Sequence, residues 1–268
     1  MDNQTKQKIK EVLKTSIRNF FKARKNKKEK IYQVLDDIFP NERRIRSLIG
    51  GLETSLGTTF WEPISETLAE SNGFEIVTTQ ILLPQPFPRE LQVELDNLIN
   101  ERAKKPNGRV STAECIQRLK NVASRTNPQE IVKYISPPPG TGVDIYFKKD
   151  GIEYVFDIKT PQANQGAFGG FNKQMLEWYA YRLAADPNAN LEARIAIPFN
   201  PFQKNWYEEQ KSKLSSSPLD ISQDIWVEDE FWDFCSGEKN TFAQLKSLFM
   251  ELGEENFAAE FNDIFYPN

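Results

Sequence analysis

The chain has 268 residues, of which 39% are hydrophobic and 12% aromatic, so it can bury a substantial core as one large domain or as a core with an added region. It contains no histidine, which excludes Ser-His-Asp and Cys-His catalysis and histidine-rich zinc sites. Any chemistry must therefore use carboxylates, lysine, tyrosine or a metal ion.

The net charge of −4 conceals an uneven distribution along the chain. Residues 1–50 carry 14 Lys and Arg against 6 Asp and Glu, whereas residues 201–268 carry 5 against 14. An anionic partner is expected to meet the first region and to be repelled by the last. The alternative for the basic run from Lys22 to Lys30 is a solvated helix face.

The two cysteines and the N-terminus indicate the cellular compartment in which the protein is expected. Cys115 and Cys235 are too isolated for a disulfide framework or a zinc site, and we expect both to be small buried side chains. The N-terminus is charged, and no stretch approaches the roughly 18 apolar residues that a membrane span requires. These features predict a soluble, cytoplasmic protein.

The first part of the chain is expected to be helical. Residues 2–38 place apolar side chains at helical spacing opposite a basic face. A second helical region is predicted over residues 41–71, with breaks near Gly50-Gly51 and around Pro63. A strand at residues 73–79 follows.

The next segment alternates between helices and extended chain. Residues 83–88 carry prolines and are expected to form a loop. Helices are predicted at 89–104 and 111–125, and the second begins with Ser111-Thr112-Ala113-Glu114, a capping-box pattern. Residues 131–135 are predicted to be a strand.

Two apolar runs separated by Asp150-Gly151 predict a β-hairpin, because Asp-Gly favours a two-residue turn. With this turn Lys149 pairs with Ile152, and counting outward places Asp144 opposite Asp157. Opposed residues share one face with Cβ atoms about 5 Å apart, and Lys159 joins them two positions along.

The hairpin is followed by a glycine- and amide-rich loop at 160–170 and a helix at 171–185, in which Met175, Trp178 and Leu183 are expected to be core residues. A strand is predicted at 191–198, and residues 201–268 are expected to be mostly helical. This order of elements predicts an α/β or α+β layered domain. We expect a basic helical region at 1–50, a core at 51–200 and an acidic helical region at 201–268.

Two opposed carboxylates repel each other unless a cation lies between them. Asp144 and Asp157 offer the oxygen ligands that Mg²⁺ prefers, and Lys159 could orient or deprotonate water, or hold a phosphate. The alternative is a cross-strand salt cluster, which would leave two acids and one lysine mostly unpaired among apolar residues. The tripeptide Glu209-Gln210-Lys211 has the same acid-x-Lys pattern, but its polar, helical context argues that it has no function.

Asp144, Asp157-Ile158-Lys159 and the helix after them resemble the PD-(D/E)xK nuclease family. Val143 stands where that motif has its proline. The family's upstream helix often donates another carboxylate, for which Glu62 is the first candidate and Glu53 the second. Glu62 could instead be the capping-box acid three residues after Thr59.

The segments 51–63 and 156–160 are together similar to the TdeIII-like group of type II restriction endonucleases. The resemblance implies a central mixed β-sheet flanked by helices and Mg²⁺-dependent cleavage of double-stranded DNA in a prokaryotic host. It also implies a homodimer that cuts a short, GC-rich, near-palindromic site, since two-fold protein symmetry matches two-fold DNA symmetry. A DNA methyltransferase is the expected genetic partner.

Base reading requires amide and cationic side chains near the cleavage face. The candidates lie in the loop and helix after the motif: Gln162, Asn164, Gln165, Asn172, Lys173 and Gln174. The alternative is an ordinary flexible connection between strand and helix. Phosphate contacts are expected from the basic N-terminal helix and from Arg102, Lys104, Lys105, Arg109, Arg118, Lys120 and Arg125.

Three other functions remain open at this point. The protein could be a repair or recombination nuclease of the same fold, or a DNA-binding module without catalytic activity. It could also be a helical interaction protein in which the hairpin is incidental.

Overall fold

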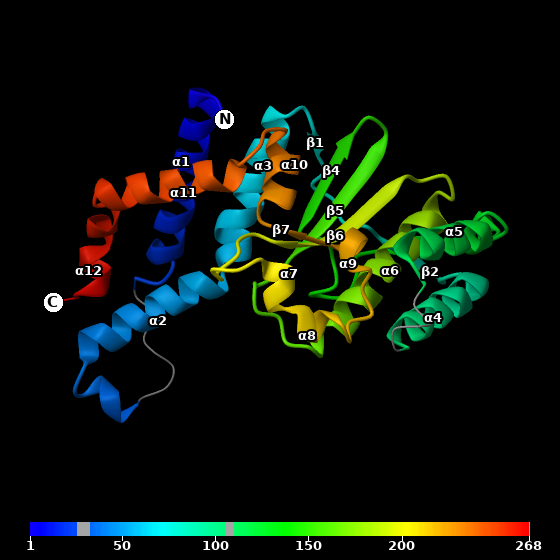
Figure 1. The fold of residues 1–268 in the computed structure, drawn as a ribbon, viewed down its shortest axis with the longest axis horizontal. Coiled ribbons are helices and arrows are strands. Elements are labelled where there is room, and N and C mark those ends of the chain that lie inside the picture. The colour runs from blue at the N-terminus through cyan, green and yellow to red at the C-terminus, as the bar shows by residue number, and fades with distance from the viewer. Residues whose placement is uncertain (26–32, 105–109, 268) are drawn as a thin grey trace. The chain divides into compact units, whose positions relative to one another are not determined.

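The computed structural model describes residues 1–25, 33–104 and 110–267, and its fold is shown in Figure 1. The chain forms two compact units: unit 1 combines Met1–Asn72 with Trp232–Asn268, and unit 2 is Gly73–Phe231. Residues 51–72, expected in the core, therefore belong to unit 1, and residues 201–231 belong to unit 2. None of the described helices is both long and apolar enough to cross a membrane.

Unit 1 is helical and joins the two ends of the chain. Its elements are α1 (Asn3–Lys22), the 3₁₀ turn η1 (Val34–Asp36), α2 (Pro40–Thr54), the π-helix η2 (Gly57–Trp61), α3 (Glu62–Ser71), α11 (Thr241–Glu254), the 3₁₀ turn η5 (Phe257–Phe261) and α12 (Asn262–Phe265). The helix α10 (Asp229–Ser236) includes the boundary between the two units.

Three predictions for this region were wrong. The first helix ends at Lys22 rather than continuing to residue 38, and residues 26–32 lie outside the described ranges. Gly50 and Gly51 lie within α2, so they do not interrupt it. Pro63 lies in the first turn of α3, where a missing N–H removes no helical hydrogen bond, so it helps to begin a helix.

The basic face of α1 is neutralised by the acidic C-terminal helices of the same unit. The amine of Lys10 lies 3.0 Å from a Glu251 oxygen and 2.5 Å from one of Glu255. Arg18 makes a bidentate pair with Glu260, with both distances 2.7 Å. Figure 1 shows α1 in blue and α11 in orange. These pairs make α1 a weaker candidate for phosphate contacts than its sequence indicates.

We therefore expect Lys10→Gln to change the affinity for duplex DNA by less than about twofold. The slope of log affinity against log salt should also stay the same, because that slope counts the phosphates that cations neutralise. Fluorescence anisotropy at several salt concentrations measures both quantities. A slope reduced by about one would show that Lys10 contacts a phosphate after all.

Unit 2 contains a five-stranded mixed sheet in the order β1-β4-β5-β6-β7, which confirms the predicted fold class. The first three strands pair antiparallel, and β5, β6 and β7 run parallel. The strands are β1 (Glu75–Ile76), β4 (Ile145–Lys149), β5 (Ile152–Ile158), β6 (Leu191–Ile197) and β7 (Ile225–Val227). A second sheet pairs β2 (Leu83–Gln85) with β3 (Lys133–Ile135), so part of the predicted loop at 83–88 is a strand.

Helices cover this sheet and build the main core. The connection from β5 to β6 is α6 (Ala167–Ala185), and α4 (Arg89–Ala103) and α5 (Thr112–Ala123) pack against it. Met175, Trp178 and Leu183 are buried, as predicted. The short elements are η4 (Pro128–Glu130), α7 (Trp206–Glu209), α8 (Lys211–Leu214) and α9 (Ile221–Asp224). The second acid-x-Lys tripeptide, from Glu209 to Lys211, lies on α7 and α8, in the helical context expected for it.

A buried ion pair connects α4 with α9 in unit 2. Arg102 is 1% exposed and Asp224 is fully buried, and the guanidinium donates a hydrogen bond to this carboxylate. Thr112 Oγ1 donates to the same carboxylate at 2.5 Å. Arg102 is therefore a core residue, and its expected role as a phosphate contact was wrong. Both cysteines are fully buried, as predicted.

Candidate active site

The hairpin that carries the candidate site forms as its sequence predicts. Asp150 and Gly151 both have positive φ, 52° and 77°, which is the conformation of a type I′ turn. Lys149 pairs with Ile152, and the ladder continues to Ile145 and Phe156. The ladder ends at this pair and Asp144 lies just outside β4, so its direct opposition to Asp157 stays a prediction.

Asp144 lies immediately before β4 and is held by the backbone of β5. Its N–H donates to Phe156 O at 3.0 Å, and its carboxylate accepts from Ile158 N–H at 2.8 Å. The Asp144 side chain is exposed, whereas Asp157 is only 2% exposed. The site thus combines one solvent-facing carboxylate with one buried carboxylate.

Lys159 is the cation nearest to Asp157 in this arrangement. Its Nζ lies 2.6 Å from both carboxylate oxygens and donates a hydrogen bond to Oδ1. The buried Oδ2 accepts no hydrogen bond of good geometry from the described residues, despite the short distance. Lys159 also packs 5.5 Å from the centre of the Phe171 ring.

Burial raises the pKa of Asp157 to about 7, and the charge of Asp144 adds to this effect. The charge of Lys159 acts in the opposite direction but does not outweigh burial. The ionised site therefore lacks positive charge, which a bound cation would supply. This electrostatic deficit was predicted from the register alone.

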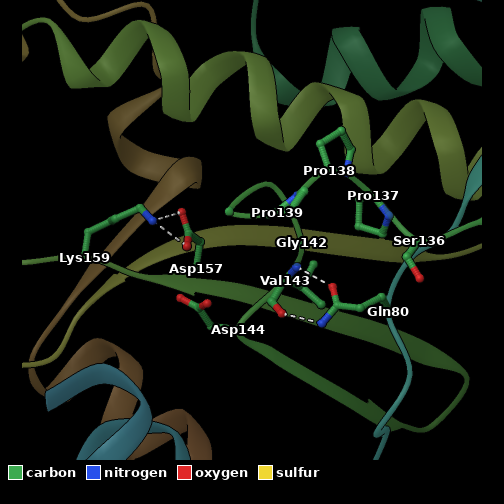
Figure 2. Close-up of a pocket in the computed structure, with 11 residues that line it drawn as sticks. Gln80, Ser136, Pro137, Pro138, Pro139, Gly142, Val143, Asp144, Asp157 and Lys159 are labelled. Atoms are coloured by element: carbon green, nitrogen blue, oxygen red, sulfur yellow. Dashed lines mark hydrogen bonds and ion pairs between the residues drawn. The ribbon is translucent and has the colours of Figure 1, made fainter. Parts of the chain in front are cut away.

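The three side chains lie together at one end of a pocket of about 390 Å³, as Figure 2 shows. The rest of the wall is formed by Gln80, Ser136, Pro137, Pro138, Pro139, Gly140, Gly142 and Val143. Gln80 was not predicted, because no motif marks it and 63 residues separate it from Val143.

The residues present suit a hard divalent cation. Among the described residues no cluster of three or more Asp, Glu or Cys side chains could hold a metal. Mg²⁺ does not require such a cluster, because it usually keeps several waters and binds one or two carboxylates plus substrate phosphate. The buried Oδ2 of Asp157, which accepts no hydrogen bond of good geometry from the described part of the chain, and the carboxylate of Asp144 in the same pocket fit a donor pair of this kind.

The predicted base-reading residues occupy two different environments. Gln162, Asn164 and Gln165 are exposed in the loop after the motif, where Gln165 donates to Ser216 Oγ at 2.5 Å. Lys173 is exposed, with its amine 3.7 Å from Glu177. These four residues are accessible to a large ligand, and their role in DNA binding stays a prediction.

The other candidates are less accessible or already paired. Asn172 is 1% exposed, and Gln174 donates to Gly142 O at 3.2 Å. Arg118 is held by the carboxylates of Glu94 and Glu101, which weakens the argument for it as a phosphate contact. Lys120 lies half-buried on α5. Lys105 and Arg109 lie outside the described residues.

Glu62 begins α3 in unit 1, whereas Asp144 and Asp157 belong to unit 2. The capping-box explanation of Glu62 was wrong, because Thr59 lies inside the π-helix η2 and donates its hydroxyl hydrogen to Ser55. Glu53 is exposed near the end of α2. A catalytic role for Glu62 or Glu53 stays a prediction.

A mixed sheet with helices around it, and two acids and a lysine at its antiparallel hairpin, fit the fold and motif of the PD-(D/E)xK superfamily. A family model described as "Type II restriction endonuclease, HinfI" matches residues 1–253. The chain belongs to this family. The assignment to the TdeIII-like group stays a prediction.

Several curated proteins are similar to this chain. The type II restriction enzyme MjaII from Methanocaldococcus jannaschii is 24% identical over 221 residues, which are 80% of this chain and 56% of MjaII. HgiCII from Herpetosiphon aurantiacus, also a type II restriction enzyme, is 23% identical over 78% of this chain and 72% of its own length. The chain thus spans little more than half the length of MjaII. No solved structure matches.

Proposed function

We propose that this protein is a type II restriction endonuclease that hydrolyses phosphodiester bonds in both strands of duplex DNA. The observation that carries the proposal is that the carboxylates of Asp144 and Asp157 line one pocket together with Lys159. Membership of the HinfI family and similarity to proteins named type II restriction enzymes support it.

Asp144 and Asp157 are the residues that would hold Mg²⁺. When bound, the ion would polarise a phosphoryl oxygen and stabilise the charge that develops during hydrolysis. Lys159 would use its ammonium group to orient the attacking water or to bind the scissile phosphate. Its ion pair with Asp157 holds the amine in the wall of the pocket, beside the two carboxylates.

The finer details of the proposal concern partners and the DNA site. We propose a homodimer acting in the cytoplasm of a prokaryote on a short near-palindromic site, with a DNA methyltransferase that protects the host. GC-rich composition of the site follows only from the TdeIII-like resemblance. Mapping the cut ends on a sequenced plasmid tests it, and sedimentation equilibrium tests the dimer.

Digestion of plasmid DNA with Mg²⁺ tests the activity itself. Discrete fragments are expected, because a restriction enzyme cuts only at its own sites. A smear or progressive loss of DNA would instead indicate a repair or recombination nuclease of the same fold. Absence of cleavage with every divalent metal would indicate a DNA-binding module and would overturn the proposal.

We expect Lys159→Met to reduce the cleavage rate by about 10²–10³-fold, the usual loss when one preorganised donor to the transition state is removed. Duplex binding in Ca²⁺ should largely survive, because both carboxylates remain. Single-turnover cleavage and fluorescence anisotropy measure the two effects. The matched control is Lys211→Met in the second acid-x-Lys tripeptide, which should cleave normally. Equal loss in both variants would contradict the role of Lys159.

A further inference from the structure

Three side chains hold the backbone segment that leads into Asp144. Trp178 Nε1 donates to Thr141 O at 2.8 Å, and Gln174 Nε2 donates to Gly142 O at 3.2 Å. Gln80 Nε2 donates to Val143 O at 2.9 Å, and Gln80 Oε1 accepts from Val143 N–H at 2.8 Å. Every residue from 141 to 143 therefore has a side-chain partner.

Gln80 takes the place of a missing strand neighbour. The strand β1 pairs with β4 at Ile76 and Phe147, and Val77 N–H donates to Tyr146 O, but this pairing then ends. Asp144 N–H points to β5, so the polar groups of Val143 point to the other side, beyond the end of the pairing with β1. The primary amide of Gln80 satisfies both groups, as the dashed lines in Figure 2 show.

Gly142 allows this close approach. A Cβ atom built at this position would lie 2.4 Å from Gln80 Oε1, closer than real Cβ contacts, and 3.0 Å from Gln80 Cδ. A larger residue would therefore displace the amide from Val143. The contact between the Gln80 amide and the Val143 backbone therefore requires both Gln80 and the absence of a side chain at Gly142.

We propose that Gln80, supported by Gly142, is a positioning residue for Asp144 in the cleavage reaction. This inference rests on the proposed nuclease function. Gln80 binds the backbone one residue before Asp144, and the Asp144 carboxylate in turn binds Ile158 N–H across the hairpin. Outer partners of metal ligands typically change affinity or activity by about 10–100-fold when removed. Gln80 acts through the backbone and does not touch the reacting atoms.

Amide hydrogen exchange in EDTA tests the positioning without any need for cleavage. In Gln80→Ala we expect Ile158 N–H, which Gln80 does not contact, to exchange at least about tenfold faster, because its acceptor on Asp144 becomes mobile. The matched control is Gln92→Ala, at an exposed position on α4. Unchanged exchange at Ile158 in Gln80→Ala would overturn the proposal, even if the wild-type protein cleaves DNA.

The activity of the same variants separates positioning from folding. Gln80→Ala should lower kcat by about 10–100-fold, with KM and duplex affinity in Ca²⁺ within twofold of the wild type. The thermal midpoint should hardly change, since Gln80 is exposed and contributes little to the core. An unchanged kcat with active wild-type enzyme would refute the positioning role. Inactive wild-type enzyme with faster exchange at Ile158 would refute the nuclease proposal instead.

Gly142→Ala should also remove the Gln80 amide from Val143, because the added methyl group would displace it. It should lower kcat about as much as Gln80→Ala, and the double variant should be no worse than either, because both changes remove one interaction. Gly253→Ala is the control, since a Cβ there would contact nothing within 4 Å. Multiplicative losses in the double variant would show that Gly142 and Gln80 act independently and would contradict the proposal.

Discussion

Asp157→Asn is expected to abolish DNA cleavage, with a rate loss of at least about 10³-fold, or about 4 kcal/mol of transition-state stabilisation. The amide has the shape of the carboxylate but cannot supply the negative oxygen that a divalent cation requires. Asp144→Asn should have a similar effect, because both carboxylates line the same pocket. Single-turnover assays with Mg²⁺ measure both losses. Cleavage retained in Asp157→Asn would refute the site.

The same Asp157→Asn variant should be more stable than the wild type in EDTA near neutral pH. Because the pKa of Asp157 is raised to about 7, the folded chain binds more protons than the unfolded chain between pH 4 and 7. The free energy of unfolding of the metal-free wild type therefore falls as pH rises through this range. Asparagine carries no charge in this pH range, so the variant does not lose this free energy of unfolding.

We expect this change to raise the thermal midpoint by about 2–4 °C at pH 7.5, the shift that about 1 kcal/mol produces in a chain of a few hundred residues. Scanning calorimetry in EDTA from pH 5 to 8 measures it, and the gain should shrink toward pH 5. A lower midpoint in the variant would favour the structural salt cluster, in which the Lys159 pair stabilises the fold.

Asp224→Ala is expected to give the largest loss of stability, about 3–5 kcal/mol, because it leaves Arg102 charged and buried. Thr112 and the N–H of Asp220 would lose their acceptor as well. Denaturant unfolding followed by circular dichroism measures the change. The control is Asp263→Ala, whose ion pair with Lys25 is more than half exposed and should contribute little.

The double change Arg102→Met with Asp224→Leu tests the physical cause of that loss. Replacing a buried ion pair with apolar side chains is often neutral or stabilising, so the double variant should recover much of the stability lost in Asp224→Ala. If the double variant is less stable than Asp224→Ala, packing around the pair rather than the unpaired charge is the cause.

Local sequence signals predicted the parts of the site that lie close together in the chain. The Asp-Gly turn requires positive φ at two residues, and both have it. The turn sets the register from Lys149 and Ile152 to Ile145 and Phe156, and this brings Asp144 and Asp157 into one pocket. The pocket, by contrast, includes Gln80 and the Pro137–Pro139 segment, which no local pattern connects to the acids.

Charge patterns were less informative, because composition does not say which charges meet. The basic α1 and the acidic C-terminal helices carry opposite charges that suggested different partners, yet Lys10 and Glu251 pair although 241 residues separate them. Arg102 looked like one of several surface cations, but Asp224, 122 residues away, holds it in the core.

The sequence by itself determined the hairpin, its register and the acidic pair, because a two-residue turn and strand alternation act over a few residues. Only the tertiary structure decided which residues support that pair and which cations are already neutralised. The reason is that Gln80, Arg102 and α1 each find their partners through chain packing over 60 residues or more. Such long-range contacts depend on the whole core, whereas the turn of the hairpin depends mainly on its own residues.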